Sequence, residues 1–555
     1  MKVTTKHQSR FLLASLPAAL AMALSQAALA QTPPDAGQLL QEQREAPSLP
    51  APSPDFRIQP QPPAEAVPGG AQVVVQRIAL SGHSVFDEAT LQGVLGEVAG
   101  QSFDLAGLRG LANRLTSFYH SQGYPFARAF LPAQTASDGV IRIEIVEGRY
   151  GKVEVRGEVA HLDQASAFVA PLANGDVIES RTLERRTLLL DDLPGIRIKP
   201  VMRPGEQLGT GDLDIVLDRD KRVGGEIGFD NHGNRYIGKH RIRANAQINS
   251  PFMLGDQISL RAIYTEADMW LGSLGYSLPV GGNGLRAFAS FAHTRYELVR
   301  DFKELDATGR ADIANLGLSY PLIRSQKRNL NLIGSYQYKS LRDKVGLTAS
   351  DEKKRSHAVP IGLQFDARDG LAGGGITFGA LTWTPGRLDL SGDARQNDTL
   401  NTHGGFNKVN LDLVRLQATP VDKMTLYVRG AGQLADSNLD SSESFTLGGA
   451  NGVRAYPSGE GVGDEGWLVQ TELRYQIAQF TPYAFFDMGY SRRNAKSNRL
   501  AGNDSTRING GGVGIRYEQS GWMIDGIAAW RGNDRPEADT KDRHPRLWVS
   551  LGYRF

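Results

Sequence analysis

The chain of 555 residues contains no cysteine. This absence excludes a disulfide scaffold, a zinc or iron–sulfur site held by thiolates, and a cysteine nucleophile. An excess of charge of one sign is also missing, because 62 lysine and arginine residues face 60 aspartate and glutamate residues. Three of the basic residues lie within residues 1–30, which hold no acidic residue. The rest of the chain is nearly neutral, so we expect no nucleic-acid partner.

Long apolar runs are rare as well. After residue 30 none reaches about 18 residues, so no later transmembrane helix is expected. Residues 1–30 combine a basic start, an apolar stretch at 11–24 and small residues at 28–30. This order is typical of a secretory signal peptide with a cleavage site. We therefore expect an exported protein that enters a membrane only as a closed barrel.

Enzyme motifs are missing too. The chain has no H-E-x-x-H, no G-x-S-x-G and no phosphate-binding G-x-x-x-x-G-K-[ST], and its ten histidines are scattered. The glycine run at 510–514 lies in an alternating strand with no helix after it, which does not suit a dinucleotide. We expect no catalytic residue, no metal and no cofactor. An outer-membrane hydrolase, whose serine and histidine meet only in space, is kept as an alternative.

Residues 31–72 contain most of the proline-rich sequence and are expected to form an extended linker. One stretch within it, 35–45, has no proline and consists mainly of helix-forming residues, including Leu39 and Leu40. The sequence therefore predicts a short helix on a tether. From its residues alone this helix is either a mobile plug or, more simply, a frayed terminus.

Residues 73–221 show the same order of elements twice. The first set is a strand, two helices and two strands, at 73–80, 87–98, 105–122, 126–131 and 140–146. The second set follows at 152–155, 162–172, 181–190, 196–202 and 213–217. A unit repeated at about 70–75 residues indicates a tandem array. We expect two small α+β modules, 73–149 and 150–221.

Residues 222–555 consist of segments about ten residues long with alternating polarity, the length of a tilted strand that crosses a bilayer. Sixteen segments are predicted: 222–232, 239–250, 257–266, 269–278, 285–297, 311–320, 329–339, 356–367, 374–384, 406–419, 424–434, 466–477, 482–490, 508–517, 522–531 and 546–555. Connections after even-numbered segments are short, and most of those after odd-numbered ones are longer. Outer-membrane barrels have this alternation, with short periplasmic turns and longer outer loops. The expected fold is an outer-membrane β-barrel of 16 antiparallel strands.

The last predicted strand carries a further signal. Its alternating apolar face ends on Tyr553 and Phe555. A terminal aromatic residue is what an outer-membrane assembly signal looks like. We expect these two residues to serve that purpose.

The longest predicted loop, 435–465, has glycines on both sides of Arg454. If this loop folds into the barrel, Arg454 needs a carboxylate, because an unpaired buried cation is costly. The strand 482–490 offers Asp487, which alternation points inward, with Gly489 leaving room on the same face. Composition alone favours the simpler alternative, an arginine in a flexible loop and an aspartate solvated in a pore.

Several motifs resemble the two-partner-secretion transporters of the haemolysin-activator type, within the Omp85 superfamily. Residues 119–149 and 183–214 are similar to the ends of that family's two polypeptide-transport-associated (POTRA) modules. Val453-Arg454-Ala455-Tyr456 matches the superfamily signature V-R-G-Y, with alanine in place of glycine, and Phe486-Asp487-Met488-Gly489 matches the partner signature F-D-x-G. The D-N-x-G-N-R-Y start of the barrel and the terminal aromatic extend the resemblance over most of the chain.

The resemblance implies a transporter in the Gram-negative outer membrane, with its POTRA modules in the periplasm. It would pass one large unfolded exoprotein, recognised through an N-terminal secretion domain, to the cell surface. The helix at 35–45 would be the pore plug, and the loop with Arg454 would fold against the wall. The implied partners are this exoprotein, outer-membrane lipid and, during biogenesis, the barrel-assembly machinery and periplasmic chaperones. Capture by strand addition points to the POTRA strands that contain Phe126, Phe130, Leu131, Ile196 and Ile198.

A second function fits the same superfamily. An insertase that assembles other barrels would carry more POTRA modules, and residues 73–221 have room for two. The sequence does not separate an adhesin, a haemolysin, a protease and a contact-dependent toxin as cargo.

Overall fold

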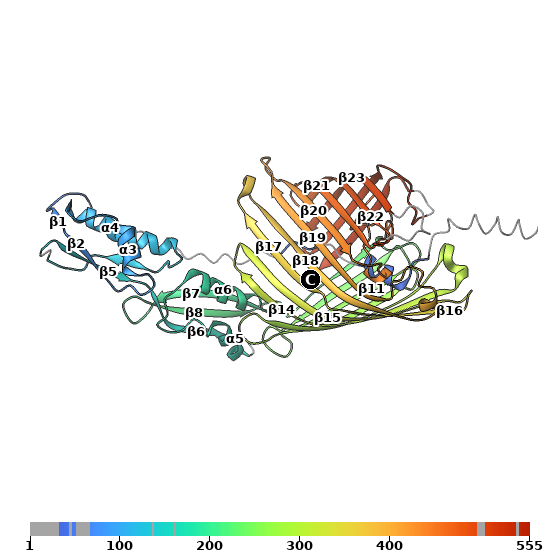
Figure 1. Cartoon of the computed structure of the whole chain (residues 1–555), viewed down its shortest axis with the longest axis horizontal. Helices are drawn as coiled ribbons and strands as arrows, with labels where there is room; N and C mark the ends of the chain where they lie inside the picture. The colour runs from blue at the N-terminus through green and yellow to red at the C-terminus, as the bar shows by residue number, and fades with distance from the viewer. Residues whose placement is uncertain are drawn as a thin grey trace, which may run out of the picture.

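The structure is a computed structural model. It describes residues 33–43, 47–50, 67–135, 138–159, 161–496, 505–539 and 543–555. The expected signal peptide at 1–30, the middle of the linker at 51–66 and the end of the expected plug helix at 44–46 lie outside the described residues. Two small α+β modules project from one end of a large barrel (Figure 1).

The first module has seven elements: β1 (Val73–Val75), β2 (Arg77–Ser81), α3 (Glu88–Leu95), β3 (Gln101–Phe103), α4 (Leu105–Ser121), β4 (Arg128–Phe130) and β5 (Val140–Val146). Both helices begin where an aspartate caps them, since Asp87 accepts a hydrogen bond from Thr90 N and Asp104 accepts one from Gly107 N. The helices cover a sheet of order β2-β5-β4, and β1 pairs with β3. The sequence pattern missed β3, whose three residues are too few to show a period.

The second module repeats this plan with β6 (Arg149–Gly157), α5 (Leu162–Val169), α6 (Ser180–Asp191), β7 (Ile196–Pro204) and β8 (Thr210–Arg219). Its sheet has the order β6-β8-β7, so β7 is an edge strand. The hydrophobic core of the module includes Leu254, which belongs to a turn of the barrel. Arg324 of the barrel also binds Asp192 at 2.6 and 2.7 Å. The second module is thus packed against the barrel mouth.

The two modules are joined through Glu147, which is 3% exposed. Its carboxylate accepts hydrogen bonds from Ser84 N at 2.6 Å, Val85 N at 2.8 Å and the Tyr119 hydroxyl at 3.0 Å. Burial alone raises the pKa of Glu147, but these hydrogen bonds outweigh it and hold the pKa below its ordinary value. Arg149 links the cluster to the second module, because it binds Glu147 at 3.0 Å and donates to the Gly175 carbonyl at 2.8 Å.

The barrel is closed by antiparallel pairing all the way round. Its strands are β9 (Val223–Asp230), β10 (Arg241–Asn249), β11 (Gln257–Thr265), β12 (Trp270–Pro279), β13 (Arg286–Glu297), β14 (Ala307–Arg324), β15 (Arg328–Val345), β16 (Ser350–Ala358), β17 (Ile361–Asp369), β18 (Gly375–Gly392), β19 (Gly404–Ala418), β20 (Met424–Ala435), β21 (Glu465–Tyr475), β22 (Phe480–Arg492), β23 (Ser505–Gln519), β24 (Trp522–Arg531) and β25 (Arg546–Arg554). Both β16 and β17 pair with β15 on one side and β18 on the other. They are two halves of one wall strand, interrupted at Val359 and Pro360, and the predicted sixteen-stranded barrel is confirmed.

Strand length differs from the sequence-based expectation on one side. A loop was expected at 340–355, but β15 continues to Val345 and β16 begins at Ser350. Likewise β18 runs to Gly392, eight residues past its predicted end. These extensions lie beyond the lipid zone, where both faces of a strand meet water, so the alternation of polarity that marks a strand is lost there. Among the described residues, no helix is both long and apolar enough to cross a membrane.

Candidate pore site: a plug helix and the loop that carries Arg454

The barrel lumen is occupied by two segments. One is the loop 436–464, which connects β20 and β21 and contains the short helix η4 (Ser441–Glu443). The other is helix α2 (Ala36–Glu42), the described part of the expected plug helix. Leu39 of α2 is 1% exposed among apolar residues of the barrel wall and outer loops, and Leu40 packs at the edge of this cluster.

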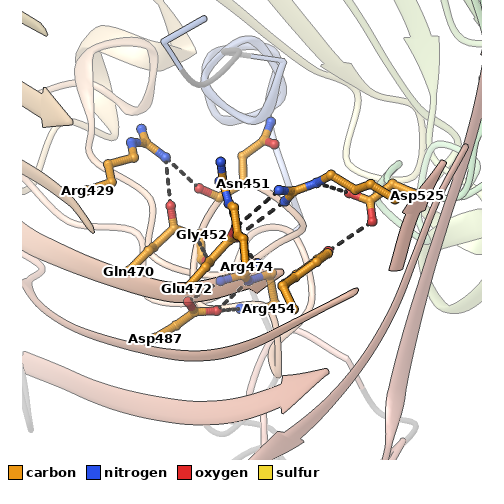
Figure 2. Close-up of polar contacts among 11 residues, drawn as sticks. Arg429, Asn451, Gly452, Arg454, Gln470, Glu472, Arg474, Asp487 and Asp525 are labelled. Atoms are coloured by element: carbon orange, nitrogen blue, oxygen red, sulfur yellow. Dashed lines mark hydrogen bonds and ion pairs between the residues drawn. The ribbon is translucent and has the colours of Figure 1, made fainter. Parts of the chain in front are cut away.

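Arg454 lies at the tip of the loop and is 2% exposed. Its Nε and Nη2 bind the two oxygens of Asp487 at 2.8 and 2.7 Å, and its backbone N donates to the same carboxylate at 3.1 Å. Its Nη1 binds Glu472 at 2.5 Å (Figure 2). Its guanidinium lies 3.7 Å from the centre of the Phe485 ring. A bidentate pair with a second carboxylate and an aromatic face satisfies an arginine that water does not reach.

Glu472 was missed by the sequence analysis, although it connects this pair to the wall. Arg474 binds it at 2.7 Å and Arg516 at 3.2 Å, and Arg516 also binds Asp525 at 3.2 Å. Glu472 lies on β21 and Asp487 on the neighbouring β22, where Gln470, not Glu472, stands opposite Asp487. Barrel register places the two carboxylates on either side of one guanidinium, and no local motif indicates this.

The residues of the partner signature, Phe486-Asp487-Met488-Gly489, alternate between the outer and inner faces of β22. Phe486 is 51% exposed on the outside, so it does not contact the loop; Phe485 provides the aromatic face instead. Gly489 does leave room, but the space is filled by Leu447, whose Cδ2 would lie 2.8 Å from a Cβ at this position. Phe486 therefore faces the outside of the barrel, as the alternation of the strand predicts, and Asp487 and Gly489 are the members of the partner signature that face the loop.

The rest of the V-R-A-Y motif is packed against the wall. Val453, Ala455 and Tyr456 are at most 5% exposed and belong to one apolar cluster with wall residues. Ala455 is not among the residues with positive φ, so this position needs no glycine here. Its Cβ faces Gly510, where an added Cβ would overlap with it. The departure from V-R-G-Y is accommodated by the glycine across from it.

Polar contacts bind α2 to the wall. Asp35 caps its first turn by accepting a hydrogen bond from Gln38 N at 2.9 Å, and it pairs with Lys354 at 2.7 Å. Ala36 N donates to Asp343 at 3.0 Å. At the other end, the Asn234 amide donates to Glu42 at 3.0 and 3.1 Å. Both ends of the short helix are thereby fixed.

The same helix is bound to the loop. The Ser441 hydroxyl donates to Asp35 at 2.6 Å, and Gln41 donates to the Ser442 carbonyl. Gly37 faces this contact: an added Cβ would overlap with Ser442 N and lie 2.9 Å from Ser442 Cα. Because the lack of a side chain lets the helix touch the loop backbone, α2 and the loop form one obstruction. A cavity of about 660 Å³ remains beside them, lined in part by Glu42, Arg241, Asp412 and Arg429.

The remaining expected site residues are less accessible or lie elsewhere. Ile196 and Ile198 are 6% and 7% exposed in the second module's core, so their side chains do not face a partner. Phe126 packs against that same core, and Leu131 against the core of the first module. Phe130 is partly buried on β4, which like β7 is an edge strand. Tyr553 and Phe555 are 40% and 42% exposed on the outer face of β25 and after it.

A closed sixteen-stranded barrel with a filled lumen, preceded by two α+β modules at one mouth, defines a POTRA-bearing transporter of the outer membrane. The family model of haemolysin secretion/activation proteins (ShlB/FhaC/HecB) matches residues 209–517, and that of the ShlB-type POTRA domain matches residues 73–148. The chain belongs to this family. Its members are two-partner secretion transporters of the outer membrane, with POTRA modules in the periplasm.

Known proteins resemble the chain over its whole length. The heme/hemopexin transporter protein HuxB of Haemophilus influenzae (strain 86-028NP) is 25% identical over 570 residues, which cover 98% of this chain and 99% of HuxB. The outer membrane transporter CdiB of Dickeya dadantii is 24% identical over 383 residues, 66% of each chain. The solved structure of CdiB from Escherichia coli has a TM-score of 0.71 at 19% identity and covers 100% of both chains, which shows a shared fold.

Proposed function

We propose that this transporter captures one large exoprotein in the periplasm through its POTRA modules and passes it unfolded through the barrel. The observation that carries the proposal is the filled lumen: α2 and the Arg454 loop obstruct it through polar contacts rather than covalent bonds. Such contacts can be exchanged, so the obstruction is removable. Cargo that folds outside the cell supplies the driving force, and no nucleotide site is needed. We propose no catalytic role.

The capture surface we propose is the free edge of β7. Within the part of the chain that the structure describes, this strand pairs only with β8, and an extended segment of cargo adds to it by backbone hydrogen bonds. Its outward side chains Arg197, Lys199 and Val201 are exposed beside this edge. They replace Ile196 and Ile198 as the side chains that meet the cargo, while β4 is the equivalent edge of the first module.

A cross-linking experiment tests this surface, because the chain has no cysteine of its own. Val201→Cys is compared with Ser166→Cys, an exposed position on helix α5 away from the sheet edge. In cells that make the exoprotein, only Val201→Cys should cross-link to it through a thiol-reactive reagent. Equal cross-linking from both positions would remove β7 from the proposal. We expect the exoprotein to be encoded beside this chain.

The proposal also covers the lipid around the barrel and the proteins that assist its assembly. Outward residues on many strands are apolar and exposed, including Phe291, Leu316, Trp383, Phe486 and Val513. Outer-membrane lipid covers them, because a bare apolar belt of this size is not stable in water. The barrel-assembly machinery and periplasmic chaperones are its partners during biogenesis, with Tyr553 and Phe555 as the assembly signal.

A further inference from the structure

The outer face of the barrel carries arginines in a regular arrangement on one side. They lie on five consecutive wall strands, one on each of β13, β14, β15, β16 and β18. Each arginine is four residues further from the POTRA end than an outward-facing residue of the belt, which is apolar or aromatic. The pairs are Phe291 and Arg295, Ala314 and Arg310, Tyr338 and Arg342, Val359 and Arg355, and Trp383 and Arg387.

The arginines lie at one common depth near the membrane surface. Four residues of strand correspond to about 13 Å, or roughly 10 Å along the membrane normal for a strand tilted by about 45°. This depth above the apolar belt is that of the lipid headgroups. The extensions of β14 to β18 point away from the POTRA modules, so the headgroups are those of the outer leaflet (Figure 1).

Their charges are balanced only in part on the protein, where Asp351 and Asp389 are the carboxylates beside them. Arg295, Arg310 and Arg342 stand directly opposite one another on three adjacent strands, an arrangement that is destabilising for like charges. Arg342 pairs with Asp351 and Arg387 with Asp389. Arg295, Arg310 and Arg355 make no ion pair with any carboxylate in the part of the chain that the structure describes. An anionic partner outside the chain would remove this repulsion.

The uninterrupted run on neighbouring strands is found on one side of the barrel; elsewhere β22 carries Arg492, four positions outward from Met488, which pairs with Glu465, and β23 carries Arg507. On β19, the residue four positions outward from Leu411 is Asn407, and on β21 Glu465 follows two positions outward from Trp467. Unspecific attachment of the barrel to an anionic membrane surface would be expected to place basic residues evenly around its circumference. A row on five neighbouring strands instead fits a defined number of anionic headgroups, each held by guanidinium groups, which bind phosphate oxygens in pairs.

We propose that the arginines Arg295, Arg310, Arg342, Arg355 and Arg387 bind the phosphate groups of the phosphorylated glycolipid that forms the outer leaflet. Trp270, which stands opposite Arg295 on β12 and is 42% exposed, marks the adjoining interface. The bound glycolipid fixes the depth of the barrel on the side where its wall strands are longest. This proposal requires only that the end of the barrel opposite the POTRA modules faces the outside of the cell. It does not depend on how cargo is captured.

The test uses the full chain reconstituted in phosphatidylcholine vesicles. The vesicles contain lipid A with both phosphates, dephosphorylated lipid A, or phosphatidylglycerol, and lipid retained by the protein is counted by native mass spectrometry. The test variant is Arg295→Gln/Arg310→Gln/Arg355→Gln. The control Arg109→Gln/Arg114→Gln/Arg181→Gln removes the same charge from exposed helix positions of the two modules, away from the sheet edges. Heat-modifiable migration on gels verifies that each barrel is folded, and Arg310→Lys supplies a milder change if the triple variant does not fold.

We expect the native chain and the control to retain phosphorylated lipid A, and the test variant to bind it about a hundredfold more weakly, given the usual contribution of each basic residue at a charged membrane surface. Arg310→Lys should fall between, because lysine cannot bind a phosphate in bidentate fashion. Unchanged retention by the test variant would overturn the proposal. The proposal would also be overturned if the native chain retained phosphatidylglycerol or dephosphorylated lipid A as well as it retains phosphorylated lipid A. A protein dimer detected without bound lipid would overturn it too. Exoprotein secretion, followed in parallel, should be normal in the test variant.

Discussion

Replacing Gly37 by alanine should open the pore. Gly37 is the residue at which helix α2 touches the loop, and its missing side chain is what permits the contact. A Cβ would overlap with Ser442 N and lie 2.9 Å from Ser442 Cα, and both atoms belong to the backbone. A flexible side chain could rotate away, but this backbone is held in η4 by hydrogen bonds, including Ser442 N to Asp440 at 3.0 Å. The helix must therefore move.

The size of the effect follows from two opposing terms. Overfilling a tight contact costs about 1–3 kcal/mol. The same substitution favours the helix itself by up to about 1 kcal/mol, because glycine is a poor helix former. The difference spans about 0–3 kcal/mol, and its middle part of about 1–2 kcal/mol corresponds to a factor of roughly 5–30 between the docked and undocked helix. Displacement also weakens the contacts of Ala36 with Asp343 and of Gln41 with Ser442.

Conductance in planar bilayers measures this change. The open probability of single Gly37→Ala channels should exceed that of the native protein by about the same factor of 5–30. Gly93→Ala is the matched control, because Gly93 also lies within a helix, α3, but nothing is found within 4 Å of an added Cβ. Gly37→Ala/Ser441→Ala should stay open, since the backbone overlap remains. Native conductance in Gly37→Ala would refute the reasoning that this contact closes the pore.

Three other perturbations test other parts of the molecule. Arg454→Ala leaves the buried Asp487 without its cation, at a cost of about 3–5 kcal/mol, while Glu472 keeps Arg474 and Arg516. Secretion should fall while the barrel stays inserted, and normal secretion would disprove the role of the loop tip. Leu254→Ala should destabilise the second module by about 2–5 kcal/mol without unfolding the barrel. The loss should appear as faster hydrogen exchange in α6. Leu208→Ala is the control and should have no effect, because Leu208 is 92% exposed. The third perturbation is a decrease in pH. The pKa of Glu147 in the folded protein lies below its ordinary value of 4.5. The stability that this carboxylate contributes is therefore complete above pH 4.5 and is lost as the pH falls through the pKa of the folded state. The protection factors of amides around Tyr119, which correct for the slower intrinsic exchange in acid, should therefore fall as the pH is lowered, while those of Glu147→Gln should be low already at neutral pH and change little on acidification.

The barrel was predictable because its signal is local. In a strand, side chains alternate between two faces, so lipid on one side and a polar lumen on the other appear directly in the order of residues. The alternation located every wall strand, including the inward Asp487 and the outward Phe486. It failed only in the extensions of β15, β16 and β18, where both faces are polar. The row of arginines that we assign to the outer leaflet lies in or next to this region.

Beyond these strands, the sequence by itself determined the two α+β modules, the tethered helix and an arginine that needs a carboxylate once its loop folds into the barrel. Only the tertiary structure decided that Arg454 has two carboxylates, that Gly37 touches Ser442, and that Leu254 completes the core of the second module. These contacts join residues brought together by the register and closure of the barrel. Because that geometry arises from pairing all strands at once, no segment of the sequence records it, and the plug, the loop and the module boundary became visible only in three dimensions.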